Sequence, residues 1–501
     1  MSSSSSETEV LICGAGAAGL ALAIDLARKG VKFRLIEKLK EPFRGSRGKG
    51  IQPRSLEVFE DLGIVNRLVA AGGPYPPQRE YREDGSCQDT QEFSDAAPTP
   101  SEPYLRPLMV PQFLTERVLR ERLAELGHAP EFGAELVGFA QDAQGVTARV
   151  VTANGEEVIA AQYLVGADGG RSFVRQALKI EFPGKTLGVR AIVADVMATG
   201  LTRDVWHRFH EGNMARQISL APLAGTEMFQ VQGPVPADGD IDLSAQGLTS
   251  LIRQRSGRQD ITIDSVSWAS AYVMNARLAD LYRVGRIFLA GDAAHIHPPT
   301  GGQGLNTSVQ DAYNLGWKLA AALNGAPVVV LDSYEQERRP IAAHMLGLTT
   351  KYLEAAKAGS MRRGRDVLQL DLGYPDSPLS LQVSSREHGL RAGDRAPDAP
   401  ITGAAGHALR LFDLFKGNHW TLIGYGGERL SVVKPRAGLR IHATGPRGDL
   451  VDVQGHLRDA YGLAAGDWVL VRPDGYVGAI VSSDQAPLLE RDLEEVGLTV
   501  R

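Results

Sequence analysis

The sequence predicts an α/β protein in three parts: a domain that begins with a βαβ unit, an antiparallel sheet inserted into it, and a small separate α/β domain at the C-terminus. Three observations support this fold class. A strand, a glycine-rich turn and a helix follow each other near the N-terminus, strand patterns dominate the middle, and a second set of short strands lies near the C-terminus. The expected bounds are 1–180 and 283–395 for the first domain, 181–282 for the inserted sheet and 396–501 for the last domain.

The N-terminal segment has the pattern of a βαβ unit. Val10 to Cys13 is a short apolar run suited to a buried parallel strand, and the spacing G-x-G-x-x-G follows it directly in Gly14, Gly16 and Gly19. Apolar residues then recur at helical spacing, and Val31 to Leu35 alternate as a second strand. This order is typical of a Rossmann-like domain.

The glycines and an acid after the second strand indicate a bound dinucleotide. Gly14 permits a tight turn, Gly16 lets the backbone approach a pyrophosphate, and Gly19 lets helix and strand pack closely. Glu37 lies 18 positions after Gly19 (37 − 19), where such units hold ribose hydroxyls. A carboxylate there favours FAD or NAD over NADP. A glycine-rich turn used only for packing is the alternative.

Length and composition exclude several classes. With 501 residues, the chain suggests about three domains. Its net charge of −5 gives no basic field for nucleic acid. Met1 to Glu7 lacks the regions of a signal peptide and no stretch reaches 18 apolar residues, so we expect no membrane contact and a cytoplasmic location. Two cysteines, Cys13 and Cys87, make no disulfide framework.

A basic, glycine-broken loop follows the βαβ unit. Arg44, Arg47, Lys49 and Arg54 fall within eleven positions, and Ser55 to Leu62 reads as a helix. The cluster is either a solvated loop or a partner for a pyrophosphate, which a guanidinium can neutralise in a forked geometry. We assign the second role to Arg47.

The next segments alternate between loop, helix and hairpin. Gly72 to Pro103 reads as a surface loop with one hairpin, and Pro111 to Leu126 as a helix. Asn154-Gly155 marks a turn between two strands. The second strand ends near Asp168, which places a carboxylate at the carboxyl edge of a sheet, where α/β folds bind ligands. A solvent-facing turn is the alternative.

The region from 181 to 282 reads as strands joined by polar loops, without helices. The strand patterns are Arg190 to Met197, Glu227 to Gln232 and Ile261 to Trp268. Such an insertion would form a wall over the cofactor, so we place the substrate in that crevice. Trp268, Tyr272 and His207 are candidate lining residues, with ordinary core or surface placement as the favoured alternative for each.

A second strand, glycine-rich loop and helix start follow around Asp292. Asn306 or Thr307 is expected to cap this helix at its N-terminus. His295 and His297 lie two apart near Asp292, but no further spaced ligand accompanies them. We therefore prefer a loop fixed by prolines to a metal site.

The C-terminal third holds a helix, a linker and a small α/β domain. Arg338 to Ala358 reads as a helix with Pro340 in its first turn and Gly359 at its end. The last hundred residues contain no cysteine, which excludes thiol redox chemistry there. We interpret this domain as a structural or dimer-stabilising module, with a partner-binding adaptor as the alternative. Its expected strands are Trp420 to Tyr425, Leu439 to His442, Asp467 to Val471 and Val477 to Val481.

Three separated motifs together resemble one family. They are GAGAAG at 14–19, GADGGRSFVR at 166–175 and GDAAHIHPPTGGQGLN at 291–306. In this order they resemble the class A flavoprotein aromatic hydroxylases, the group that contains para-hydroxybenzoate hydroxylase, phenol hydroxylase and the polyketide hydroxylases. The resemblance extends over the stretch RAGDRAPDAP at 391–400 and the thioredoxin-like tail of the larger members. It implies a Rossmann-like FAD-binding domain, an inserted substrate domain and a thioredoxin-like C-terminal domain.

The resemblance also implies residue roles. Glu37 would hold the adenosine ribose of FAD, Arg47 and Gln112 would contact the pyrophosphate and ribityl region, and Asp292 would bind the ribityl or phosphate end. Motif residues at 168 and 171 are thought to serve FAD and the nicotinamide donor, those at 298 and 299 would border the oxygen-reactive face of the flavin, and those at 305 and 306 would lie beside its pyrimidine ring. The expected cofactor-binding set is Gly14, Gly16, Ala17, Ala18, Gly19, Glu37, Lys38, Arg47, Gln112, Leu136, Asp168, Asp292, Gly302, Leu305 and Asn306.

The implied activity is a monooxygenase reaction. NADPH or NADH would reduce FAD, and O2 captured as a flavin C4a-hydroperoxide would hydroxylate a phenolic or polyketide aromatic substrate, while the protein excludes water. No side chain is assigned as catalytic. The alternatives are Baeyer–Villiger-type oxygenation or another flavin oxidation of a polyketide or antibiotic, and a non-enzymatic carrier. The expected partners are a small aromatic substrate, O2 and a second copy of the chain in a homodimer.

Overall fold

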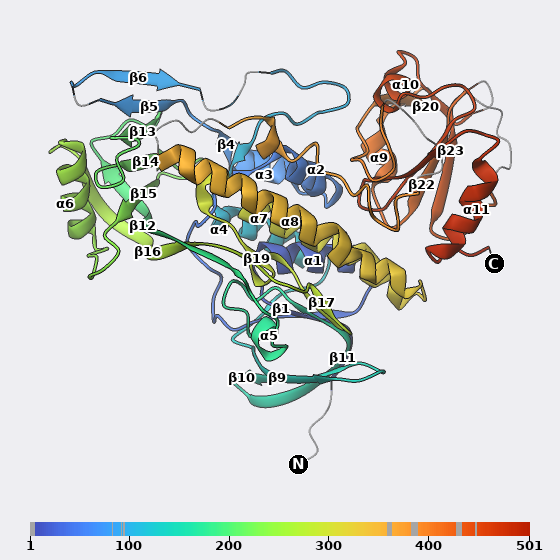
Figure 1. Cartoon of the computed structure of the whole chain (residues 1–501), viewed down its shortest axis with the longest axis horizontal. Coiled ribbons are helices and arrows are strands. Elements are labelled where there is room, and N and C mark those ends of the chain that lie inside the picture. The colour runs from blue at the N-terminus through green and yellow to red at the C-terminus, as the bar shows by residue number, and fades with distance from the viewer. Residues whose placement is uncertain are drawn as a thin grey trace.

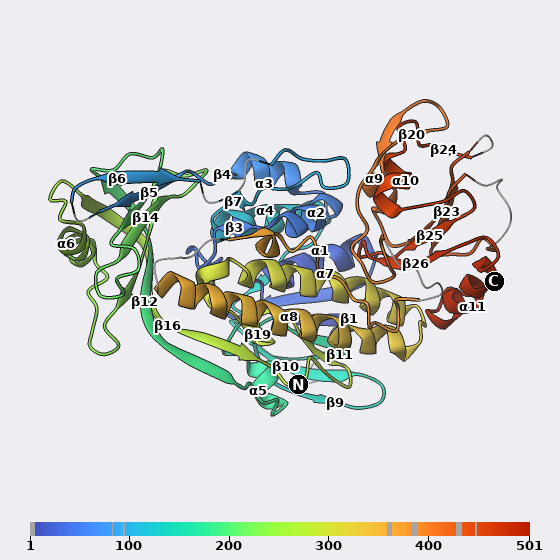
Figure 2. The same cartoon turned by 45° about the horizontal axis from the view of Figure 1, so that its top comes forward.

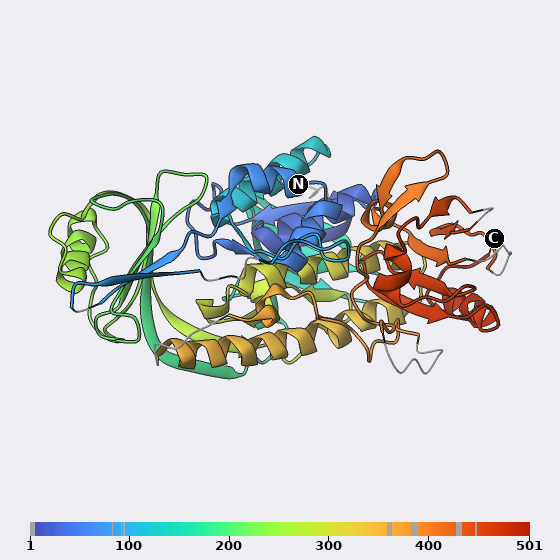
Figure 3. The ribbon, with the colours of Figure 1, turned by 90° about the horizontal axis from the view of Figure 1, so that it is seen from above.

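The computed structural model describes residues 6–82, 84–91, 93, 96–357, 363–381, 389–426, 433–445 and 448–500. Three parts lie in a row, with a mainly antiparallel sheet at one end, a helix-covered mixed sheet in the middle and the C-terminal domain at the other end (Figure 1 and Figure 3). Helix α8 (Val328–Lys357) runs along the middle part from one end to the other (Figure 2). Among the described residues, no helix is long and apolar enough to cross a membrane.

The middle part is built on an eight-stranded sheet. Strand β1 (Ser6–Cys13) lies between β2 (Phe33–Glu37) and β11 (Gly155–Gly166) and is parallel to both, and β18 (Ile287–Leu289) is parallel to β11 on its far side. Helix α1 (Ala17–Arg28) connects β1 to β2, as the βαβ pattern predicts. The other strands of this sheet are β8 (Glu131–Phe132), β9 (Glu135–Gln141), β10 (Val146–Thr152) and β17 (Arg283–Val284).

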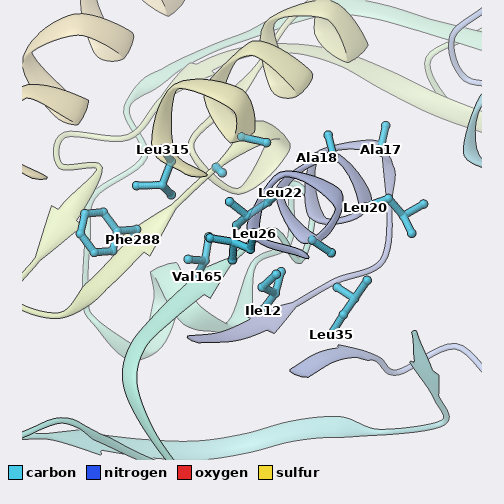
Figure 4. Close-up of a cluster of buried hydrophobic side chains, with 14 of the residues drawn as sticks. Ile12, Ala17, Ala18, Leu20, Leu22, Leu26, Leu35, Val165, Phe288 and Leu315 are labelled. Atoms are coloured by element: carbon cyan, nitrogen blue, oxygen red, sulfur yellow. The ribbon is translucent and has the colours of Figure 1, made fainter. Parts of the chain in front are cut away.

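The core of this part lies where helices cover the sheet. Leu26 of α1, Ile12 of β1 and Val165 of β11 meet there with no exposed surface (Figure 4). Each side chain buried in this way contributes about 1.5–3 kcal/mol. The main covering helices are α1, α4 (Gln112–Glu125) and α7 (Gly304–Leu323).

The antiparallel sheet is the predicted insertion. Its long central pair is β12 (Gly184–Thr199) with β16 (Thr262–Leu278). The predicted hairpin within 72–103 is also present, and it extends this sheet at its far edge. The remaining strands are β5 (Gln78–Tyr81), β6 (Cys87–Thr90), β13 (Trp206–Phe209), β14 (Ile218–Pro222), β15 (Phe229–Val235) and β19 (His295–Ile296).

The expectation that no helix interrupts these strands is wrong. Helix α6 (Ala245–Ser256) lies between β15 and β16. Ser244 caps its N-terminus by accepting a hydrogen bond from the backbone N–H of Gly247, and Gly257 ends it with φ +72°. These caps, with Leu248 and Ile252 buried against the sheet, outweigh the polar character of the segment.

Two expected helix starts differ from the structure. Helix α7 begins at Gly304 with Gln303 at the N-cap, so neither Asn306 nor Thr307 caps it. Helix α8 begins ten residues before Arg338 (338 − 328), which places Pro340 in its interior. Its early start is a run of β-branched valines, which favour strands locally. Val328 is 61% exposed, whereas Val329 and Val330 pack against the C-terminal domain. Gly359, the expected end of this helix, lies outside the described residues.

The C-terminal domain has a four-stranded sheet in the order β23-β22-β25-β26. Strand β22 (Trp420–Gly424) is parallel to β23 (Leu439–Ala443) and antiparallel to β25 (Trp468–Val471), which pairs antiparallel with β26 (Val477–Val481). With α11 (Ala486–Glu495) after the last strand, this is the thioredoxin-like arrangement that the sequence predicts.

The shorter elements connect these parts. They are α2 (Pro53–Asp61), α3 (Val65–Ala71), α5 (Phe173–Ala177), α9 (Leu411–Phe415), α10 (His456–Tyr461), β3 (Gly50–Ile51), β4 (Gly73–Pro74), β7 (Leu108–Met109), β20 (Pro400–Gly403), β21 (Ala408–Arg410) and β24 (Leu450–Val451).

Candidate functional site

The three glycines of the first motif have different surroundings. A Cβ on Gly14, whose φ is +108°, would lie 2.2 Å from the carbonyl oxygen of Ala167, and a Cβ on Gly19 would lie 1.9 Å from that of Gly14. A Cβ on Gly16 would meet nothing closer than Oε1 of Glu116 at 4.0 Å. Gly14 and Gly19 are therefore required by packing, whereas Gly16 faces open space at the N-terminus of α1. A pyrophosphate needs such a space beside unpaired N–H groups.

Glu37 braces this turn from the end of β2. Its Oε2 accepts a hydrogen bond from the backbone N–H of Ala15 at 2.9 Å, and its Oε1 accepts one from that of Leu39 at 2.9 Å. The carboxylate is half-buried, and Lys38 beside it is exposed. A half-buried carboxylate with two lone pairs still available can accept ribose hydroxyls.

The other two motifs meet the first at the same edge of the sheet. The backbone N–H of Ala167 donates to the carbonyl of Cys13 at 2.8 Å, and that of Ala290 donates to the carbonyl of Gly166 at 3.0 Å. A Cβ on Gly291 would lie 3.2 Å from Cβ of Ala18 in α1. Three motifs separated by more than a hundred residues therefore form one continuous surface.

Asp168 contributes a carboxylate to this surface. Its Oδ2 accepts a hydrogen bond from the backbone N–H of Val174 at 3.1 Å. Its Oδ1 is buried and has no hydrogen-bond partner among the described residues. A buried carboxylate oxygen without a partner is costly and is rare away from ligand sites.

Asp292 of the third motif lies near Arg47. The Asp292 side chain is exposed to solvent, yet the surrounding protein raises its pKa by desolvation, while His295 and Arg47 oppose the rise. Burial also raises the pKa of Tyr272 in β16 to about 12, again opposed by Arg47. The exposed Arg47 guanidinium is therefore close enough to act on one residue of the third motif and on one of the inserted sheet.

The other basic residues of that loop have structural partners. Lys49 donates to Oε1 of Gln230 at 2.8 Å, and Arg54 donates to Oε2 of Glu57 at 2.8 Å. Both side chains are buried. Arg44 is exposed and pairs with Glu41.

Gln112 and Glu116 join the Arg47 loop to the first motif. Oε1 of Gln112 accepts from the backbone N–H of Arg47 at 3.2 Å, and its Nε2 donates to Oε1 of Glu116 at 2.8 Å. Glu116 is 2% exposed and lies at the open side of Gly16. Burial raises its pKa to about 7, while Gln112 and Arg120 oppose the rise and Glu37 adds to it.

The third motif ends in the first turn of α7. Asn306 is fully buried, its Oδ1 accepts from the backbone N–H of Gln52 at 2.8 Å, and its Nδ2 donates to the carbonyls of Gly50 and Gly302. Its side chain is thus committed to holding two loops together. Leu305 beside it is half-buried.

The two histidines of this motif bind each other and an acid. Nε2 of His295 lies 2.6 Å from Oδ2 of Asp311, and Nε2 of His297 lies 2.9 Å from Nδ1 of His295. Asp311 also accepts from Arg338 at 2.8 Å. Within the described part of the chain, no group of three or more side chains could hold a metal ion.

One face of the antiparallel sheet lies against the Arg47 loop. Asp195 of β12 pairs with Gln230 of β15 and Trp268 of β16, so these side chains share a face. Trp268 packs on Gly45 and lies edge-on to Phe43 at 5.3 Å.

The alternate residues of these strands point away and pack on α6. His207 belongs to that far side, where its ring bonds Tyr81 and the carbonyl of Thr202. Tyr272 and Trp268 therefore share the face that meets the Arg47 loop, whereas His207 lies on the opposite face.

Comparisons with known proteins agree with this geometry. The family model of the FAD binding domain matches residues 7–349, and that of the aromatic-ring hydroxylase C-terminal domain matches 389–497. The chain is 40% identical over 485 residues to a flavin-dependent monooxygenase of Mycobacteroides abscessus, covering 96% of this chain and 98% of that protein. It is 31% identical over 506 residues to the 6-methylpretetramide 4-monooxygenase of Streptomyces rimosus, covering 94% and 90%.

A solved structure has the same fold. It is aklavinone-11 hydroxylase in complex with FAD and aklavinone, with a TM-score of 0.85 and 28% identity over 98% of this chain and 99% of that one. The chain belongs to the FAD-dependent aromatic hydroxylases. The predicted family, fold class, enzyme class and FAD cofactor are thereby confirmed.

The hydroxylase brings the loops that carry most of the predicted cofactor residues together at one edge of the sheet. Leu136 differs in position, because its side chain is 5% exposed and lies in the hydrophobic core. Glu116 is the residue that sequence reading missed. The available signal was its place four residues after Gln112, on the same face of a helix.

The residues present fit FAD. Gly16 leaves the space that a diphosphate requires, and Asp168, whose Cα lies 3.0 Å from the position of a Cβ on Gly14, has a buried oxygen without a hydrogen-bond partner among the described residues. A bound dinucleotide would fill the space and would supply a partner for such an oxygen.

Proposed function

We propose that this hydroxylase oxidises NADPH or NADH and uses O2 to hydroxylate a phenolic or polyketide aromatic ring. The observation that carries the proposal is the meeting of three distant motifs around the open space at Gly16, opposite a sheet face that can hold a substrate. Relatives whose names specify polyketide substrates, such as 6-methylpretetramide 4-monooxygenase, support the substrate class.

The proposed cofactor contacts follow from position. Backbone N–H groups at Gly16, Ala17 and Ala18 would bind the diphosphate at the positive end of α1. Glu37 would accept the adenosine ribose hydroxyls, and Arg47 would neutralise a phosphate from the other side of the cleft. Gln112, Asp168, Asp292, Gly302, Leu305 and Asn306 would complete the site around the ribityl chain and the ring.

Bound FAD would supply the redox chemistry, by accepting hydride from the nicotinamide and activating O2. The protein's part is electrostatic and steric. Helix α7 begins at Gly304, and its positive end would face the flavin ring, which becomes negative on reduction. The sheet face with Tyr272 would cover the ring and exclude water, so that the reactive oxygen meets the substrate.

The proposed domain roles place the substrate between the inserted sheet and the third motif. This face of the sheet combines polar and aromatic side chains, such as Gln230 and Tyr272, with aliphatic ones, such as Val193. Such a lining suits a planar, hydroxylated ring system, which offers apolar faces and polar edges.

The test combines spectroscopy with turnover. The purified chain should show a flavin spectrum and consume NADPH or NADH faster when a phenol or polyketide from a panel is added. Hydrogen peroxide is monitored in parallel, and product mass and regiochemistry distinguish ring hydroxylation from Baeyer–Villiger-type insertion. Hydroxylated product with little peroxide would support the proposal. A product that carries oxygen inserted into a carbon–carbon bond would overturn it, as would substrate-independent oxidation that yields peroxide with every compound of the panel.

A further inference from the structure

A buried carboxyl group lies where the diphosphate of FAD is expected. Glu116 extends from α4 to the N-terminus of α1, where its Oε1 is 4.0 Å from the position that a Cβ on Gly16 would take. Only 2% of the residue is exposed, so water cannot screen its charge. In the protein alone, the positive end of α1 favours the carboxylate form of Glu116, whereas burial of the group opposes it.

The charge of Glu116 is balanced by one cation, and Arg47 is already assigned to a phosphate of the proposed FAD site. On its own helix, Gln112 donates to its Oε1 at 2.8 Å, and Nη1 of Arg120 lies 3.9 Å from its Oε2. From β2 the carboxylate of Glu37 acts on it unfavourably, and from α1 the backbone N–H of Ala17 acts favourably. Gln112 links it to the Arg47 loop. A diphosphate would add two negative charges beside Glu116.

We propose that Glu116 takes up one proton from solvent when FAD binds, so that a neutral carboxyl group lies beside the diphosphate. The ionised group and the diphosphate compete for the same helix end, and the neutral group removes that repulsion. The neutral carboxyl also gains an O–H, which can donate to a phosphate oxygen. This inference rests on the proposed FAD site at Gly16 and adds a residue that controls the affinity of that site.

Even without FAD, the pKa of Glu116 lies near neutral pH. Burial raises its pKa to about 7, and a bound anion would raise the pKa further. Because binding takes up a proton, the affinity for FAD falls as the pH rises from the pKa of Glu116 in the free protein towards its pKa in the FAD complex. The Kd for FAD should therefore increase about tenfold for each pH unit above about 7, up to the pKa of the bound state.

The test measures FAD release from the holoenzyme. Serial dilution at constant ionic strength, followed by flavin fluorescence, gives the Kd at pH values from 6 to 8.5. The wild-type Kd should rise with pH, whereas E116Q, which keeps an acceptor for Gln112, should show a Kd nearly independent of pH. Glu121→Gln removes a carboxylate from the exposed side of the same helix and should retain the wild-type slope.

Infrared spectroscopy gives a second readout without turnover. The wild-type holoenzyme at pH 7.5 should show the band of a protonated carboxyl group, and E116Q should lack it. A flat wild-type profile, or a slope that persists in E116Q, would overturn the inference while the FAD site stands. A chain that binds no FAD at any pH would instead overturn the proposed site and the inference together. If E116Q does not fold, the wild-type slope and band decide.

Discussion

At the scale of single residues, two glycines of the first motif have different roles, one in FAD binding and one in folding. Gly16 has φ −74°, which any residue adopts, and open space in front of it. Gly16→Val should therefore leave the folded protein intact but abolish FAD binding, because the side chain fills the diphosphate space. Gly19→Val should instead destabilise the protein by about 1–3 kcal/mol or more, because its Cβ would clash with the backbone of Gly14.

The measurements are the flavin-to-protein absorbance ratio and urea unfolding of both variants. A yellow, active Gly16→Val protein would remove this turn from the diphosphate site. Equal losses of stability in the two variants would show that Gly16 also serves packing.

Asp292 is the second residue whose role can be isolated. A hydrogen bond to a charged group contributes about 1.5–3 kcal/mol, so Asp292→Ala should weaken FAD binding by about one to two orders of magnitude. Asp264→Ala, an exposed site on β16, is the matched control and should bind FAD as the wild type does. Flavin content after dilution measures both, and unchanged occupancy in Asp292→Ala would remove this residue from the site.

At the scale of elements, α7 and α8 are joined by a buried charge cluster: Lys318, Glu337, Arg472 and Asp474. Arg472 comes from the C-terminal domain and binds both carboxylate oxygens of Glu337, at 2.7 and 2.9 Å. Arg472→Leu leaves that carboxylate without its main partner and should lower the free energy of unfolding by about 3–5 kcal/mol. Arg491→Leu, on an exposed side chain of α11, should change it little. Urea midpoints of the two variants compare them directly.

The same cluster predicts a pH dependence of stability. Burial alone would raise the pKa of Glu337, but Arg472 and Lys318 outweigh burial and the pKa is lowered. A carboxyl whose folded pKa is depressed stabilises the fold above its unfolded pKa, about 4.3, and loses that contribution as the pH falls. The melting temperature should thus fall as the pH drops below about 5, where the unfolded carboxyl begins to bind a proton, and it should fall less steeply in Glu337→Gln. Parallel curves for the two proteins would contradict this assignment.

At the scale of the whole molecule, the C-terminal domain is tied to the FAD-binding part by its core as well as by charge. Trp317 of α7 packs edge-on against Trp420 of β22 at 5.8 Å, within one continuous apolar cluster. Deletion after Pro400 removes these partners and leaves Glu337 and Lys318 buried without Arg472. We expect the shortened chain to aggregate or to lose flavin, measured as soluble yield and flavin content. A stable yellow 1–400 protein would favour the alternative that this domain is a detachable, partner-binding adaptor.

Sequence reading succeeded where the signal is local. The three motif loops, the βαβ unit and the C-terminal strands are each specified by adjacent residues, and the structure places the loops together as expected. It failed where tertiary contacts decide. The burial of Glu116 depends on how α4 meets α1, and at the start of α8 the contacts of Val329 and Val330 with the C-terminal domain favour the helix. Asn306 looked like a helix cap, yet its amide holds two distant loops.

The environment of Cys13 affects how well the protein resists oxidation by hydrogen peroxide from its own reaction. Its thiol lies at the end of β1, next to the first motif, and burial, Asp168 and Glu37 raise its pKa well above the usual value. Peroxide attacks thiolates rather than thiols, so this sulfur should resist the hydrogen peroxide that an oxygen-activating flavin releases when it runs without substrate. Cys87, exposed on β6 at the far end of the molecule, should be oxidised first. Oxidation of the protein would then begin far from the cofactor site, and Cys87 at the edge of the sheet would be oxidised before flavin is lost.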